Sequence, residues 1–126
     1  MRLHPNELWI YYHDSLGSQK KTRVHATSIT NHVHEVNIAR EKITRLRWVE
    51  ILDMLNVEAK KLMNKADPIY QNLLARHDFD QNDWLEILVK NPGLLKAPIA
   101  IMNDRAILCE SPKDIYKLPV NEISGF

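Results

Sequence analysis

The chain has 126 residues, of which 44% are hydrophobic and 26% charged, and this length allows one domain with a substantial core. Seventeen basic and sixteen acidic residues give a formal net charge of +1, so the overall charge favours neither nucleic acid nor anionic membranes as a partner. The single cysteine, Cys109, excludes an internal disulfide, a Cys-x-x-Cys pair and a thiolate zinc site. With neither an export signal nor a membrane-length apolar run, we expect one cytoplasmic domain over residues 1–126, a monomer by default.

The first third of the chain predicts a strand, a helix and a second strand. The apolar run 8–12 is typical of a buried strand, and a polar loop follows it. A weakly amphipathic helix is expected over 18–28, with Val24 and Ile29 on its apolar face. The β-branched content of 32–38 favours the second strand.

The middle of the chain predicts helices. Thr44 is a plausible N-cap for the first of them, and short helices are expected over 58–64 and from Pro68 to about residue 76. The apolar stripe of the first helix, expected to face a core, comprises Leu46, Trp48, Val49, Ile51, Leu52 and Leu55.

A further helix begins near residue 80. Asp80 can cap it, Asp83 stands three residues later, and Phe79 can pack against Trp84. The sequence 91–93, Asn-Pro-Gly, ends this helix.

The last part of the chain predicts a hairpin and a closing helix. Strands over 97–102 and 105–109 are separated by Asn103-Asp104, a two-residue turn, and a helix is expected over 113–118.

This order of elements is that of a thioredoxin-like α/β fold. It gives a mixed four-stranded sheet built from a βαβ half and a ββα half. We expect the thioredoxin-like core at about 8–42 and 91–118, with a helical insertion at about 43–90.

Two stretches carry a family resemblance. Asn-Pro-Gly-Leu-Leu-Lys-Ala-Pro-Ile-Ala-Ile at 91–101 and Arg-Ala-Ile-Leu-Cys-Glu-Ser-Pro at 105–112 resemble the C-terminal half of the glutaredoxin-dependent arsenate reductase (ArsC) and Spx family. Upstream, 10–13 resembles its first strand, and the similarity extends from about Leu8 to Leu118.

The resemblance implies a cis proline at Pro98 and an attacking thiolate in the loop after the first strand, where a helix N-terminus lowers the thiol pKa. This sequence has Gly17 or Leu16 at the thiol position. Ser15 and Ser18 are close by, but a hydroxyl without an adjacent general base is a weak nucleophile.

The resemblance also implies three arginines that hold the arsenic oxyanion. The corresponding positions are Asn64, Ala97 and Glu110, an amide, a methyl group and a carboxylate. Because the thiol and all three arginines are missing together, we expect arsenate reduction to be absent.

The other reactive side chains favour structural roles. Cys109, at the end of a hairpin strand, is interpreted as a small buried hydrophobe in preference to a displaced nucleophile. His32 and His34 are interpreted as residues of an edge strand in preference to metal ligands, because no third ligand is evident. His13 is interpreted as a structural partner of the loop after the first strand, in preference to a general base. We call this loop the vacant loop, because its thiol position holds no nucleophile.

Lys20, Lys21 and Arg23 form a basic cluster on the first predicted helix. A solvated helix face is the favoured interpretation, and binding of an anion or an acidic partner near the helix N-terminus is the alternative.

The leading hypothesis is a non-catalytic family member, a pseudoenzyme that binds an unknown protein or a small anionic ligand without a cofactor, metal or membrane. Direct nucleic-acid binding is disfavoured, because the aromatic residues are expected to be buried. Alternatives are an Spx-like transcription regulator, with an RNA polymerase subunit as partner, and a divergent glutathione- or anion-dependent oxidoreductase or transferase. The candidate site comprises Ser15, Gly17, Ser18, Lys20, Lys21, Asn64 and Pro98.

Overall fold

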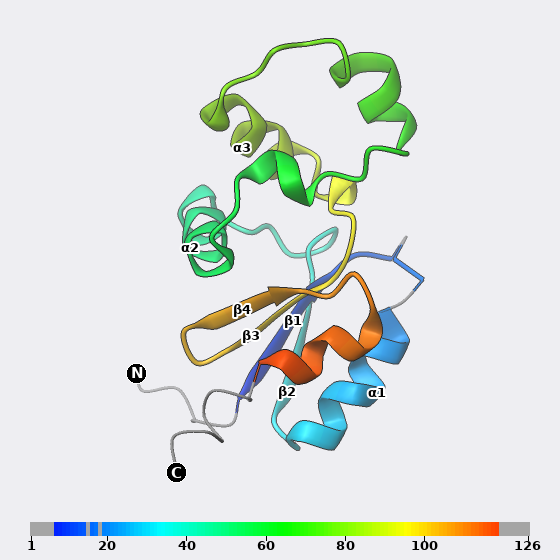
Figure 1. Cartoon of the computed structure of the whole chain (residues 1–126), viewed down its shortest axis with the longest axis vertical. Coiled ribbons are helices and arrows are strands. Elements are labelled where there is room, and N and C mark those ends of the chain that lie inside the picture. Colours follow the sequence, from blue (N-terminus) through cyan, green and yellow to red (C-terminus); the bar gives the residue numbers. More distant parts are fainter. Residues whose placement is uncertain (1–6, 15, 18, 119–126) are drawn as a thin grey trace.

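A computed structural model describes residues 7–14, 16–17 and 19–118. Its centre is one four-stranded sheet in the order β2-β1-β3-β4 (Figure 1). The strands are β1 (Leu8–Tyr12), β2 (Val33–Asn37), β3 (Ile99–Met102) and β4 (Arg105–Leu108). The mixed α/β sheet expected from the sequence is therefore confirmed.

The pairing of the strands follows from their connections. β1 pairs with β2 in parallel, with Leu8 opposite Val33, because α1 (Gln19–Ile29) carries the chain back between them. β3 is antiparallel to β1, and β4 is antiparallel to β3. Asn103, in the tight turn between them, has a positive φ of 57°, a conformation that asparagine tolerates well.

One face of the sheet is covered by α1 and by η4 (Pro112–Lys117), a 3₁₀ helix (Figure 1). Alternate residues of each strand point to this face. Its buried core comprises Leu8, Ile10, Ala26, Ala100, Met102, Cys109, Ile115 and Leu118.

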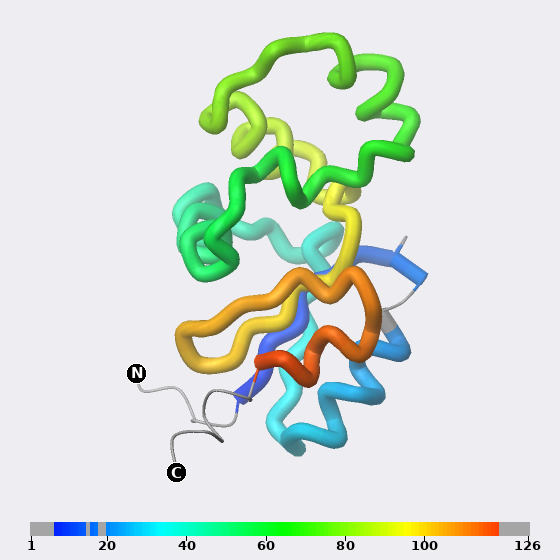
Figure 2. The backbone as a smooth tube through the Cα atoms, in the orientation of Figure 1, coloured from blue at the N-terminus to red at the C-terminus, as the bar shows by residue number. Residues whose placement is uncertain are grey.

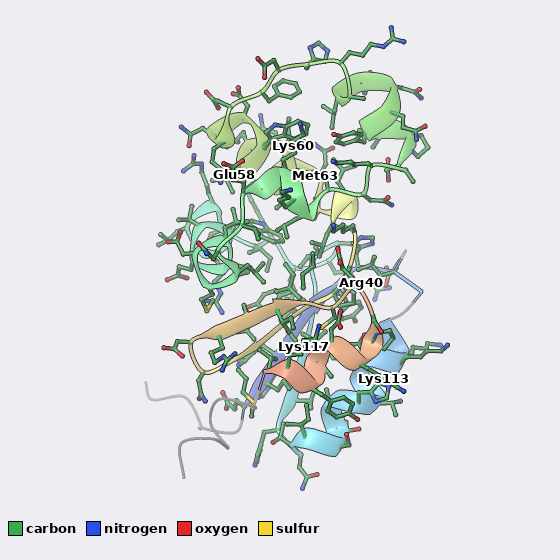
Figure 3. The ribbon with its side chains drawn as sticks, in the orientation of Figure 1. Arg40, Glu58, Lys60, Met63, Lys113 and Lys117 are labelled. Atoms are coloured by element: carbon green, nitrogen blue, oxygen red, sulfur yellow. The ribbon has the colours of Figure 1, made fainter. Side chains whose placement is uncertain are left out.

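The other face is covered by the helical insertion between β2 and β3. Its helices are α2 (Arg45–Leu55), η1 (Ala59–Leu62), η2 (Tyr70–Leu74), α3 (Gln81–Lys90) and η3 (Pro92–Leu94). The tube in Figure 2 shows this insertion on the opposite side of the sheet from η4, and Figure 3 places Met63 in the insertion and Lys113 on η4.

Local capping signals were predicted correctly. The Thr44 side chain accepts a hydrogen bond from the Arg47 amide at the start of α2. Asp80 and Asp83 form a reciprocal capping box at α3. Phe79 packs edge-on against Trp84, with ring centroids 5.1 Å apart.

The apolar faces of two helices were predicted only in part. Leu46 is 70% exposed, because it lies about 200° around the helix from the buried Trp48. Val24 is 67% exposed, and α1 instead turns Thr22 and Ala26 to the core. The expectation that Leu46 and Val24 lie on the apolar faces of their helices is therefore wrong.

Several element boundaries also differ from the predictions. The helix expected over 58–64 is the four-residue 3₁₀ turn η1, and the helix that starts at Pro68 continues as the π-helical turn η2. The closing helix is 3₁₀, and β4 ends before Cys109. Among the described residues, no helix is long and apolar enough to cross a bilayer.

Candidate functional site

The loop after β1 is anchored by side chains at its start. His13 is only 4% exposed, and its Nε2 donates to the Leu95 carbonyl oxygen over 2.8 Å, so this nitrogen carries the proton. Asp14 accepts a hydrogen bond from Asn37 at 2.9 Å and lies 3.9 Å from the Arg40 guanidinium. This buried contact supports the interpretation of His13 as a structural residue.

The position expected for the thiol holds no nucleophile. Gly17 is exposed, and a β-carbon added to it would meet no neighbouring atom within 4 Å. Leu16 is half-buried and packs against the core on the insertion side of the sheet. Ser15 and Ser18 lie outside the described residues. The loop therefore has space for a side chain at residue 17.

The basic cluster lies at the start of α1, which the loop leads into. Lys20 and Lys21 are both exposed, and neither forms an ion pair with any residue that the structure describes. Arg23 lies 3.5 Å from Glu35 of β2. Lys20 and Lys21 are therefore the two members of the basic cluster whose charge is not paired with a described residue.

The three positions where the family resemblance implies arginine are occupied by side chains with other roles. Asn64 accepts a hydrogen bond from the Ala66 amide through Oδ1 at 3.1 Å, a local turn. Ala97 is 5% exposed, and Glu110 lies 2.7 Å from the Lys96 ammonium group. This arrangement offers an oxyanion no forked cationic donor at these three positions.

Pro98 differs from the expectation, since its peptide bond is trans. The proline is buried, and its carbonyl oxygen accepts the Cys109 amide at 2.7 Å. Pairing with β4 thus continues one residue before β3, and this hydrogen bond holds the backbone at Pro98. The implied cis proline is therefore wrong.

Cys109 is fully buried in the core beneath η4. Burial, with a smaller contribution from Asp114, raises the pKa of its thiol from 9.0 to about 12. A thiol with such a pKa stays protonated at neutral pH, whereas the thiolate is the form that attacks a substrate. Its interpretation as a small hydrophobe is confirmed.

His34 lies on the edge strand β2, as predicted, whereas His32 stands one residue before this strand. His34 stacks on Trp9 of β1, with ring centroids 4.4 Å apart, and its Nε2 lies 3.6 Å from the Glu7 carboxylate. In the described part of the chain no group of three or more metal-ligating side chains is brought together.

The fold brings only some of the candidate residues close to one another. The hydrogen bond from His13 to Leu95 joins the loop to the segment before Pro98, and the Asn64 amide donates to the Leu94 carbonyl at 2.7 Å. Lys20 and Lys21, both exposed, form no hydrogen bond or ion pair with these described residues.

A hollow that the sequence analysis did not anticipate lies between the 38–43 loop and the end of α3. It measures about 440 Å³, and its lining includes Arg40, Lys42, Trp48 and Lys90. Arg40 connects it to Asp14 of the vacant loop and is labelled in Figure 3. Its walls lie far apart in the chain, and this explains why motif spacing did not reveal it.

Solved structures establish the class of this fold. An arsenate reductase from Vibrio cholerae superposes with a TM-score of 0.77 at 15% identity, covering 89% of this chain and 97% of that one. An arsenate reductase (ArsC) related protein from Brucella melitensis gives 0.68 at 17% identity, covering 88% and 92%. The fold is therefore the thioredoxin-like fold of arsenate reductases.

The sequence identifies the family within that class. The ArsC family model matches residues 11–118, so the chain belongs to the ArsC family. A curated relative, Regulatory protein MgsR of Bacillus subtilis, is 26% identical over 113 residues, which cover 89% of this chain and 90% of that protein.

Proposed function

We propose that this ArsC-family protein is a pseudoenzyme that acts by binding in the cytoplasm and carries out no thiol chemistry. The observation that carries the proposal is the position of its only cysteine. Cys109 is buried on the α1 and η4 side of the sheet, whereas the loop after β1 presents Gly17. A thiolate must be exposed and stabilised to attack a substrate, and neither condition is met.

The charges at the implied anion-binding positions support the same proposal. Glu110 brings a carboxylate where the family resemblance implies a cation, and its ion pair with Lys96 occupies a nearby positive charge. An incoming oxyanion would meet a compensated ion pair at this point in place of a free cation, which disfavours its binding.

Intact-mass spectrometry tests the proposal on the full chain. The native protein is incubated with arsenate, glutathione and glutathione disulfide, and its mass is compared with that of protein unfolded in guanidinium chloride. We expect no adduct on the native protein and one glutathione per chain on the unfolded protein. A native adduct that disappears in Cys109→Ser would overturn the proposal.

A second candidate function is that of an Spx-like transcription regulator. The similarity to a relative named as a regulatory protein favours it, since that likeness extends over almost the whole chain. Size-exclusion chromatography with purified RNA polymerase tests this role, with co-elution as the expected result. Separate elution at micromolar concentrations of both proteins would contradict it.

A further inference from the structure

The two edges of the sheet differ in chemistry. The β2 edge carries His34, Glu35 and Asn37, and Glu35 is also engaged by Arg23 of α1. Polar and charged residues protect an edge strand against pairing with another chain. β4, with the sequence Arg-Ala-Ile-Leu, has its only charge at its first residue, so it is the more apolar edge.

The register shows which backbone groups of β4 are free. The Cys109 amide donates to Pro98, and in an antiparallel pair such bonding residues alternate with residues whose groups point away. Ala106 and Leu108 therefore direct their N–H and C=O groups away from β3. The Leu108 carbonyl accepts the Glu110 amide at 3.1 Å. The Ala106 N–H, the Ala106 C=O and the Leu108 N–H have no hydrogen-bond partner among the described residues.

A hollow of about 320 Å³ borders this free edge. One side is formed by Leu55, Val57 and Lys61, from the end of α2 to η1, and the other by β4. Its volume is at the lower end of the range for ligand pockets, enough for a few side chains. The hollow therefore offers apolar contacts next to unpaired backbone groups.

The charge at this hollow is positive. Lys96 is neutralised by Glu110 at 2.7 Å. Lys61 is exposed and forms no ion pair within the described parts of the chain. A partner with an acidic side chain would complete the charge balance here.

Several backbone groups of the segment 94–98 are already hydrogen-bonded. The carbonyls of Leu94 and Leu95 accept the Asn64 amide and the His13 side chain. The Lys96 amide donates to Leu62, and the Pro98 carbonyl is taken by Cys109. A peptide laid against this segment would find these four groups occupied, whereas three of the four outward groups of Ala106 and Leu108 have no partner among the described residues.

We propose that the outer edge of β4 binds an extended, acidic segment of a partner protein as a fifth strand. The segment hydrogen-bonds to Ala106 and Leu108, places apolar side chains in the hollow and directs a carboxylate to Lys61. This inference rests on the proposed binding function and names the chemistry of the partner.

A displayed library of random octapeptides, panned against the full chain, tests the site. We expect the selected peptides to alternate β-branched or apolar residues and to contain an acidic residue. Ala106→Pro removes one outward N–H without breaking a bond to β3, and we expect at least a tenfold weaker affinity. Ala106→Ser keeps the N–H and serves as the matched control, with affinity unchanged.

Two further changes test the chemistry of recognition. Lys61→Glu should weaken the selected peptide at least tenfold, and less so at high salt. Methylation of alternate backbone nitrogens of the peptide should abolish binding, because these N–H groups would donate to the edge. Binding that tolerates both changes would contradict strand addition.

Amide hydrogen exchange measured by NMR observes the edge directly. In the free protein, the Ile107 amide should exchange slowly and those of Ala106 and Leu108 quickly. The selected peptide should slow the latter two at least tenfold. Protection of both amides in the free monomer would overturn the proposal.

Other outcomes would distinguish a failure of the β4 site from a failure of the proposed binding function. Peptides whose affinity survives Ala106→Pro but is lost in Gly17→Trp would place the partner at the vacant loop, leaving the binding function intact. If the protein dimerises and Ala106→Pro abolishes the dimer, a second copy of this chain occupies the edge. This result would overturn the proposal of an acidic partner segment. Failure to select any peptide would also overturn it.

Discussion

Cys109 and Gly17 are the two residues that carry the proposal that this chain lacks thiol chemistry. Cys109 ends the hairpin inside a core, where burial raises the pKa of the thiol to about 12. Gly17 stands in an exposed loop that could hold a side chain but supplies none. The reactive group is absent from the exposed position, and the thiol that is present is protected.

The raised pKa of Cys109 predicts a loss of stability at alkaline pH. The thiol ionises above pH 9.0 in the unfolded chain but only near 12 in the folded one, so the free energy of unfolding falls between these values. The slope approaches about 1.4 kcal/mol per pH unit. Urea unfolding from pH 7.5 to 10.5 should show this fall for the wild type, relative to Cys109→Ala. Parallel pH profiles would contradict it.

A thiol introduced at residue 17 should be reactive, in contrast to the buried thiol of Cys109. In Gly17→Cys/Cys109→Ala, the new thiol is exposed near the start of α1, which favours the thiolate. We expect iodoacetamide to label it at pH 7.5 at least a hundredfold faster than native Cys109. Equal rates, followed by mass spectrometry, would show that Cys109 is more accessible than its burial indicates.

Elements whose ends carry strong local signals were predicted well from the sequence. The caps of α2 and α3 depend on contacts within three or four residues, so Thr44, Asp80 and Asp83 were identified without tertiary information. The exposure of Leu46 and Val24, in contrast, depends on where the sheet lies. The free edge of β4 follows from strand order and pairing, which no local spacing encodes.

The cap of α3 provides a test at this scale. Asp80→Ala removes the side chain that accepts the Asp83 amide at 2.8 Å, and we expect a loss of about 1 kcal/mol in the free energy of unfolding. Asp78→Ala, two residues earlier and exposed, is the matched control, with a change within about 0.5 kcal/mol. Equal effects in urea unfolding would show that the cap contributes nothing.

For the molecule as a whole, the family resemblance predicted the sheet and the insertion, and the structure corrected the surroundings of Pro98. The peptide bond before Pro98 is trans, and the Pro98 carbonyl is hydrogen-bonded to Cys109. The substitution of the anion-binding arginines was evident in the sequence, but the ion pair of Glu110 with Lys96 was not, because it joins two segments of the fold. The molecule thus keeps the family's sheet and presents two features not anticipated from the sequence, the hollow near Arg40 and the β4 edge.

The central claim, that the native fold performs no thiol chemistry, is tested most directly by an arsenate reduction assay. Wild-type protein and Cys109→Ser are incubated with arsenate, glutathione and glutaredoxin, and NADPH consumption is followed through glutathione reductase. We predict that both proteins give the rate of the protein-free blank. Arsenate-dependent NADPH consumption by the wild type that is lost in Cys109→Ser would contradict the claim.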